Sequence, residues 1–93
     1  MNYLETIKFG SNKLKKNKID SHILDSELLL SFVLKLSREQ ILLNLDSDIK
    51  KKNFKKFKKF LSRREKKEPM AYIIKKKEFW KNNFYVNRDV LIP

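Results

Sequence analysis

Residues 20–35, DSHILDSELLLSFVLK, are the most strongly apolar stretch of the chain and decide its fold class. Leucines and other apolar side chains recur along this stretch at helical spacing and form a wide face. Asp20 or Ser21 can cap a helix here by accepting a hydrogen bond from a free amide of the first turn. We therefore predict a helix over residues 20–35 that is the most buried element of a small helical bundle.

Two shorter patterns flank this segment. Residues 2–16 place apolar side chains at helical spacing, and Asn17 fits a left-handed stop for that helix. Ser37 and Gln40 have the spacing of a capping box, which predicts the start of a short third helix. Both patterns favour further helices on either side of the leucine-rich one.

A fourth helix is expected over residues 48–66, with a turn and cap supplied by residues 46–48. Phe54, Phe57 and Leu61 lie on one side of it and the remainder is basic. We interpret it as a core helix with a solvated lysine face, because the leucine-rich helix needs a partner. An RNA-binding helix or a membrane-surface helix would show the same pattern.

The spacing of the apolar residues changes towards the end of the chain. Pro69 can begin a short fifth helix, since its missing N–H costs nothing in a first turn. Residues 76–87 then carry β-favouring side chains around a turn-forming asparagine pair, with strands expected near 77–80 and 84–87. The predicted fold is mainly α: a bundle of four to five helices over residues 1–74, followed by a β-hairpin linker over residues 75–93.

Composition limits the classes of function. The 93 residues make one small domain at most, and the absence of cysteine excludes disulfides and thiolate metal sites. No apolar run has the length of a signal peptide or a membrane span, so we expect a cytoplasmic, soluble and monomeric protein without a membrane partner. The net charge of +12 is compatible with a nucleic-acid partner, because clustered cations release counterions from phosphates. The positive residues are mostly lysine, however, and the lysine-rich composition of an AT-rich genome is the favoured explanation.

Catalytic chemistry is not expected from these residues alone. A single glycine excludes a glycine-rich phosphate loop, and a single histidine, His22, cannot build a metal site or a catalytic triad. The acidic residues Asp20, Asp25 and Glu27 are most simply partners in ion pairs. We predict no catalytic residue, no metal ligand and no cofactor-binding residue in the helical part.

Two segments resemble the start of the HemK-type (PrmC) release factor glutamine methyltransferases. The first is LDSELLLSFVLKLSREQ at residues 24–40, and the second is RREKKEPMAYIIKKKEFWKNNFYVNRDVLIP at residues 63–93. The second is highly specific, because Pro69 and Tyr72 recur at the family's spacing together with Glu78, Phe79 and Trp80. The chain departs from the family at three positions that usually hold glycine, and we expect remodelled turns at these lysines: Lys67, Lys75 and Lys81.

The resemblance implies an N-terminal helical domain, a hairpin linker and a Rossmann-like catalytic domain that lies beyond Pro93. The full enzyme would transfer a methyl group from S-adenosylmethionine to the glutamine of the Gly-Gly-Gln loop of peptide chain release factors. The residues expected at the interdomain linker are Pro69, Tyr72, Glu78, Phe79 and Trp80. Leu91, Ile92 and Pro93 correspond to a segment at the edge of the cofactor pocket.

Within this resemblance the expected core consists of Leu24, Leu28, Leu29, Phe32, Phe54, Phe57 and Leu61. The leading functional hypothesis is recognition of a release factor, with the enzyme's own catalytic domain as a second partner. The alternatives are a basic helical RNA-binding module and a purely structural clamp for the catalytic domain. The isolated chain should be inactive and should not bind S-adenosylmethionine.

Overall fold

The computed structural model describes residues 1–74, which form five helices. In chain order they are α1 (Tyr3–Lys16), α2 (His22–Leu34), α3 (Arg38–Leu42), α4 (Lys51–Glu65) and α5 (Met70–Ile73). The predicted mainly helical bundle is confirmed for these residues, in which the only β pairing is an isolated bridge between Asn2 and Asp48. The predicted β-hairpin linker lies outside the described residues.

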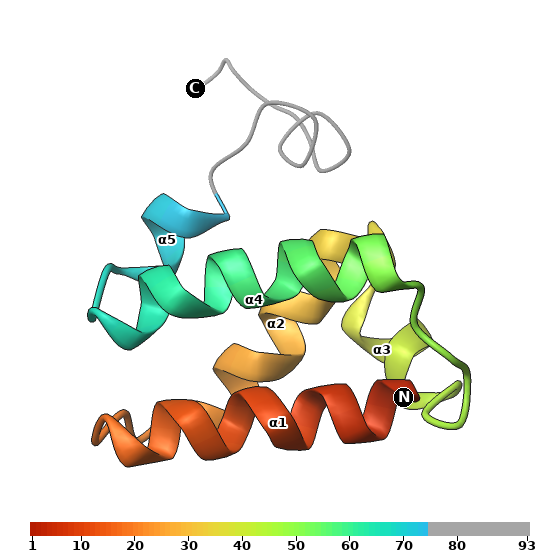
Figure 1. Ribbon diagram of the computed structural model, residues 1–93, viewed down its shortest axis with the longest axis horizontal. Coiled ribbons are helices and arrows are strands. Elements are labelled where there is room, and N and C mark those ends of the chain that lie inside the picture. The colour runs from red at the N-terminus through yellow and green to blue at the C-terminus, as the bar shows by residue number, and fades with distance from the viewer. Residues whose placement is uncertain (75–93) are drawn as a thin grey trace.

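Three helices make the body of the bundle. Figure 1 shows α1 and α4 next to each other with α2 behind them, and each of the three contacts the other two. The short α3 packs against α2, and α5 packs against α4. Among residues 1–74, the helices are too short or too polar to cross a membrane.

The core lies between these three helices. Four predicted core residues, Leu29, Phe32, Phe57 and Leu61, are buried. Phe54 and Leu28 are half-buried, and Phe54 packs against the core. The remaining buried hydrophobic side chains are Ile7, Leu14, Ile19, Leu30, Ile41 and Ile73.

The prediction that Leu24 belongs to the core is wrong, because 44% of it is exposed. Nearly every side of α2 carries apolar residues, so periodicity alone does not show which side is covered. Within residues 1–74 the side that bears Ile23 and Leu24 is left exposed. The consequence is an apolar surface at the N-terminal end of α2.

The N-terminal ends of the helices confirm one predicted cap and correct two others. Ser37 and Gln40 form the expected capping box, with Gln40 N–H donating to Ser37 Oγ at 3.1 Å. Ser21 does precede α2, but its hydroxyl donates to Asp25 and caps no amide. Lys50 stands at the N-cap of α4, so the cap expected from residues 46–48 is wrong.

The first helix shows a cap that was not predicted and a stop that was misplaced. Asn2 and Glu5 form a capping box at the start of α1, with Glu5 N–H donating to Asn2 Oδ1 at 2.8 Å. At its end, Asn17 has a negative φ and the left-handed residue is Lys18. The left-handed stop therefore lies one residue later than predicted.

Candidate functional site at the junction of α4 and α5

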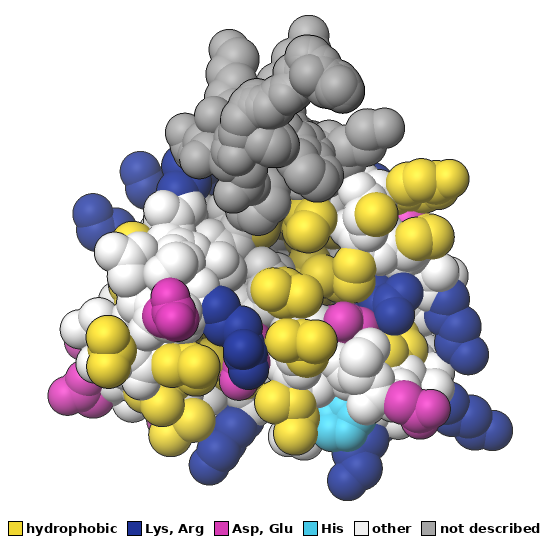
Figure 2. All heavy atoms as spheres, turned by 180° about the vertical axis from the view of Figure 1, so that it is seen from behind, with side chains coloured by type: hydrophobic (Ala, Val, Ile, Leu, Met, Phe, Trp, Pro, Cys, Tyr) yellow, Lys and Arg dark blue, Asp and Glu magenta, His cyan; other side chains and the backbone are white. Residues whose placement is uncertain are grey.

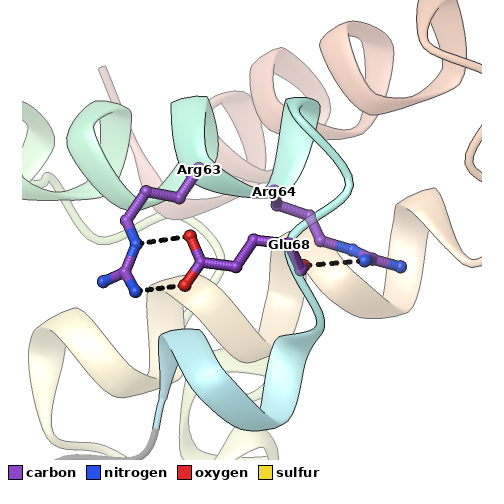
Figure 3. A network of polar contacts seen from close by, with 3 residues as sticks. All are labelled: Arg63, Arg64 and Glu68. Atoms are coloured by element: carbon purple, nitrogen blue, oxygen red, sulfur yellow. Dashed lines mark hydrogen bonds and ion pairs between the residues drawn. The ribbon is translucent and has the colours of Figure 1, made fainter.

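The segment that joins α4 to α5 is held by an ion pair between Arg63 and Glu68 (Figure 3). Arg63 Nε donates to Glu68 Oε1 at 2.9 Å, and Arg63 Nη2 donates to Glu68 Oε2. Two parallel hydrogen bonds between a guanidinium and a carboxylate fix the orientation of both groups. The last turn of α4 is thereby tied to the residue that precedes Pro69.

Arg64 connects the same segment to the body of the bundle. Its Nη1 donates to the backbone oxygen of Glu68 at 2.9 Å, and its Nε donates to Asp25 Oδ2 at the same distance. Asp25 is buried in α2 and also accepts a hydrogen bond from Ser21. Figure 3 shows Arg64 reaching past the turn on the side opposite Arg63. One arginine thus joins α2, α4 and the start of α5.

Between these arginine contacts the chain turns at Lys67, whose φ is 68°. Its amide donates to the oxygen of Arg64 at 2.8 Å, so the turn closes directly on the last residues of α4. Lys67 therefore adopts the left-handed conformation itself, and the expectation of a remodelled turn is wrong at this position. Lys75 and Lys81 lie outside the described residues.

Pro69 stands immediately before α5 with a φ of −59°, and its oxygen accepts hydrogen bonds from Tyr72 and Ile73. The predicted short helix is confirmed, with Pro69 at its N-cap. Ile73 is fully buried and anchors α5 in the core, whereas 65% of Tyr72 is exposed. The junction therefore presents the aromatic ring of Tyr72 at the surface.

Electrostatics at the junction follow from the ion pair. The hydrogen bond from Arg63 lowers the pKa of Glu68 below its usual range, with the attraction of the positive charge adding to this and desolvation opposing it. The same hydrogen bond raises the pKa of the Arg63 guanidinium. Both groups are therefore charged at neutral pH.

The other acidic residues of α2 also meet arginine. Arg38 Nε donates to Glu27 Oε1 at 2.6 Å, which ties α3 to α2. The prediction of ion pairs is confirmed for Asp25 and Glu27, with arginine as the partner in both cases. His22 Nδ1 lies 2.7 Å from Ser11 Oγ, and no cluster in the part that the structure describes has the ligands for a metal ion.

The other predicted site residues lie outside the described part of the chain. They are Glu78, Phe79, Trp80, Leu91, Ile92 and Pro93. Sequence reasoning singled out Pro69 and Tyr72 but assigned no role to the charged residues just before them, Arg63, Arg64 and Glu68. The available signal was the acidic residue at 68 that follows two consecutive arginines across a tight turn.

Two of the elements joined at the junction carry exposed apolar side chains. Ile23 and Leu24 of α2 are 56% and 44% exposed, and Tyr72 of α5 is exposed as well. Figure 2, which views the bundle from behind, shows hydrophobic side chains gathered down the middle of that face. Exposed apolar surface of this kind is typical of a site where another protein surface docks.

Comparisons with known proteins identify a family. Residues 5–74 match the family model of the PrmC N-terminal domain. The chain is 40% identical over 93 residues to a release factor glutamine methyltransferase of Buchnera aphidicola subsp. Acyrthosiphon pisum, and 44% identical over 84 residues to a bifunctional methyltransferase of Rickettsia felis. These alignments cover 100% and 90% of this chain, respectively.

A third relative, the release factor glutamine methyltransferase of Buchnera aphidicola subsp. Schizaphis graminum, is 45% identical over 69 residues, which is 74% of this chain. The chain spans only 33%, 16% and 25% of these three relatives in the order given. No solved structure matches it. The match covers all five helices almost completely and includes the arginine-held junction, and on this ground the chain belongs to the PrmC N-terminal domain family.

Proposed function

We propose that this chain is the N-terminal part of a release factor glutamine methyltransferase and that its helical bundle recognises the release factor. The relatives' names supply the reaction class, and the whole enzyme would use S-adenosylmethionine as the methyl donor. The observation that carries the recognition role is the uncovered side of α2 at Ile23 and Leu24. A helix that is apolar on nearly all sides needs cover on each of them.

The chemistry explains why a separate recognition domain is useful. An amide nitrogen is a poor nucleophile, so the enzyme must hold the glutamine side chain in line with the methyl group. A second contact away from the reacting loop raises the effective concentration of the substrate and aligns it. The junction at Arg63, Arg64 and Glu68 would transmit this alignment, because it joins α5 to α2 and α4 through charged hydrogen bonds.

Binding of the 93-residue chain to a purified release factor, measured by calorimetry, tests the recognition role. We expect a measurable micromolar affinity, and we expect Leu24→Lys to weaken it at least tenfold because a charge replaces an apolar contact. Leu43→Lys is the matched control, since Leu43 is 82% exposed on another part of the bundle. Both substitutions change exposed residues, so both variants should remain folded.

Two results would contradict the proposal. One is an affinity too weak to measure at high micromolar concentration while the full enzyme binds normally, which would leave the domain a structural clamp. The other is an equal loss of affinity in Leu24→Lys and Leu43→Lys.

We also expect calorimetry to detect no heat when S-adenosylmethionine is added to this chain. Measurable binding at millimolar cofactor would contradict the assignment of the cofactor to the rest of the enzyme.

A further inference from the structure

A second surface of the bundle has the opposite character. Residues 50–59, KKKNFKKFKK, carry seven lysines and no acidic residue, and every one of these lysines is exposed. Six of them belong to α4, which crosses the front of the bundle in Figure 1. We call this set the lysine face: Lys50, Lys51, Lys52, Lys55, Lys56, Lys58 and Lys59.

The bundle provides no counter-charge for the lysine face. All three ion pairs among residues 1–74 are made by arginine, and they use Asp25, Glu27 and Glu68. Within the same residues, no lysine of the face forms an ion pair with an acidic side chain. The arginines hold the fold together, and these lysines are left available for an external anion.

The spacing of these lysines destabilises α4. Lys51 and Lys55 repel each other at a separation of four residues, as do Lys55 and Lys59, because such positions are neighbours on a helix. Lys51 and Lys52 also lie in the first turn, where the helix dipole disfavours positive charge and where α4 has no acidic residue and no side-chain cap. Folding alone gives no reason for this pattern.

The basic surface continues onto α1. The rings of Phe9 and Phe54 meet between α1 and α4 with centroids 5.3 Å apart. Lys13 Nζ lies 5.2 Å from the centre of the Phe9 ring, and Lys58 Nζ lies 5.2 Å from that of Phe54. The half-buried ring of Phe54 thus holds Lys58 of the lysine face in place, and the ring of Phe9 adds one further ammonium group, that of Lys13 on α1.

Two kinds of anionic partner fit this surface poorly. Insertion into a membrane surface needs an exposed apolar side, but that side of α4 is already buried in the core at Phe57 and Leu61. Protein interfaces are enriched in arginine, aromatic residues and methionine and are depleted in lysine, which is the reverse of the lysine face. Lysine in long rows is typical of contacts with phosphate groups.

We propose that the lysine face binds the phosphate backbone of a nucleic acid without reading its base sequence. Lysines contribute through counterion release from the phosphates, and this contribution depends on charge spacing rather than on bases. The proposal is independent of release-factor recognition, which uses the uncovered side of α2. The two surfaces could be occupied at the same time, because they use different residues.

Fluorescence anisotropy of the 93-residue chain with a labelled single-stranded RNA of mixed sequence tests the proposal. We expect binding at low salt, with an affinity that falls steeply as salt rises, and similar affinity for an RNA of unrelated sequence. The same measurement with a labelled DNA duplex shows whether the chain prefers RNA or binds phosphate groups of any nucleic acid. Absence of binding to both nucleic acids at low salt would overturn the proposal.

The decisive variant is Lys51→Glu/Lys52→Glu/Lys55→Glu. It places two acids in the first turn of α4 and creates Glu–Lys pairs from 52 to 56 and from 55 to 59, so the helix should be at least as stable as before. We expect at least a tenfold loss of affinity. The magnitude of the salt slope should fall by about 2, because each phosphate of a single strand that a lysine neutralises adds about 0.7 to it.

The matched control is Lys8→Glu/Lys15→Glu/Lys35→Glu, which gives the same net charge through exposed lysines outside the lysine face. We expect it to lose no more than about twofold in affinity under the same conditions. Equal losses in the two triple variants would overturn the proposal in favour of a general charge effect. Binding of polyglutamate or of anionic vesicles as tightly as RNA would overturn it in favour of an acidic protein or a lipid surface.

Discussion

The chain uses its only glycine inside a helix and places lysine where helices usually end in glycine. Gly10 lies in α1, where this helix contacts α2 and α4. A Cβ atom at this position would lie 2.4 Å from Ser26 Oγ and 2.7 Å from Phe57 Cζ. Neither distance is possible without a shift, so Gly10 is required by space and not by its backbone angles.

The helix ends show the opposite choice. Lys18, Lys35 and Lys67 follow the last turns of α1, α2 and α4, and their φ angles are 62°, 57° and 68°. A side chain in this conformation costs about 1 kcal/mol or more, a cost that glycine avoids. All three lysines are exposed, so their side chains meet no neighbour that would add to it.

A position can require glycine because a Cβ atom has no space or because the backbone is left-handed. In this fold the first requirement is the stricter one. At the helix ends the backbone strain is modest and surrounding hydrogen bonds can offset it, as they do around Lys67. Between three packed helices a single added carbon meets a buried ring that has no room to move. Predictions that separate backbone strain from crowding therefore test the comparison directly.

The largest effect is expected from Arg64→Met, which removes the side chain that holds the turn at Lys67. Arg64 pairs with Asp25, and the loss would leave a carboxylate that is 6% exposed with Ser21 as its one remaining side-chain partner. Breaking a buried pair in this way costs about 3–5 kcal/mol. Urea denaturation at pH 7 measures the loss of unfolding free energy.

Arg63→Met provides the comparison for that variant. Arg63 and Glu68 are about one-third exposed and water screens their attraction, so removing this pair should cost much less stability than removing the buried pair of Arg64 and Asp25. If Arg63→Met and Arg64→Met lose the same stability, the turn is not held by its link to α2. In that case the backbone of Lys67 would be tolerated for another reason.

The second effect concerns Gly10→Ala. In an open helix this change would stabilise the protein by about 1 kcal/mol through helix propensity. Here the added methyl group meets Ser26 and Phe57, so we expect a net loss of about 1–3 kcal/mol by overpacking. Thermal unfolding monitored by circular dichroism measures the sign.

Asn12→Ala, in the same helix at an exposed position, is the control and should be neutral or slightly stabilising. In the double variant Gly10→Ala/Phe57→Leu, the shorter side chain removes the ring atom nearest to the new Cβ. We expect it to be less destabilised than the sum of its single variants. Strict additivity would show that Phe57 is not the source of the crowding.

The sequence patterns that predicted this fold correctly are local ones. The capping box at Ser37 and Gln40 could be read directly, since its partners stand three residues apart. Asn2 and Glu5 carry the same signal, which the prediction overlooked. Periodicity could not predict the exposure of Leu24, because apolar residues lie on nearly every side of α2 and do not mark the side that its neighbours leave open.

The candidate site was only partly predictable for a similar reason. Pro69 and Tyr72 stood out through their spacing, but the partner of Asp25 is Arg64, which is 39 residues away in the chain. Many lysines lie closer in sequence, and only the packing of α2 against α4 selects the arginine. Pairings that depend on tertiary arrangement leave no local pattern in the sequence.

The third effect is smaller and opposite in sign. Lys67→Gly relieves the left-handed backbone but also gives the unfolded chain more freedom, so we expect a net gain of no more than about 1 kcal/mol. Lys66→Gly is the matched control, because the neighbouring lysine is also exposed but has a φ of −82°. It should lose about 0.5–1 kcal/mol. A loss of stability in Lys67→Gly would mean that the lysine side chain itself supports the turn.

The smallest effect is the dependence of the Lys67 turn on pH. The pKa of Glu68 is lowered in the folded protein by the hydrogen bond from Arg63, so the folded state binds the proton less readily than the unfolded state does. The stabilisation is therefore complete above the ordinary glutamate pKa of about 4.3 and is lost as pH falls through the lower folded value. Comparing the chain with Glu68→Gln isolates this group from the other carboxylates. The difference in unfolding free energy should be present at pH 7 and should shrink towards pH 3; a difference that stays constant over this range would mean that the charge of Glu68 contributes nothing to holding α5 against α4.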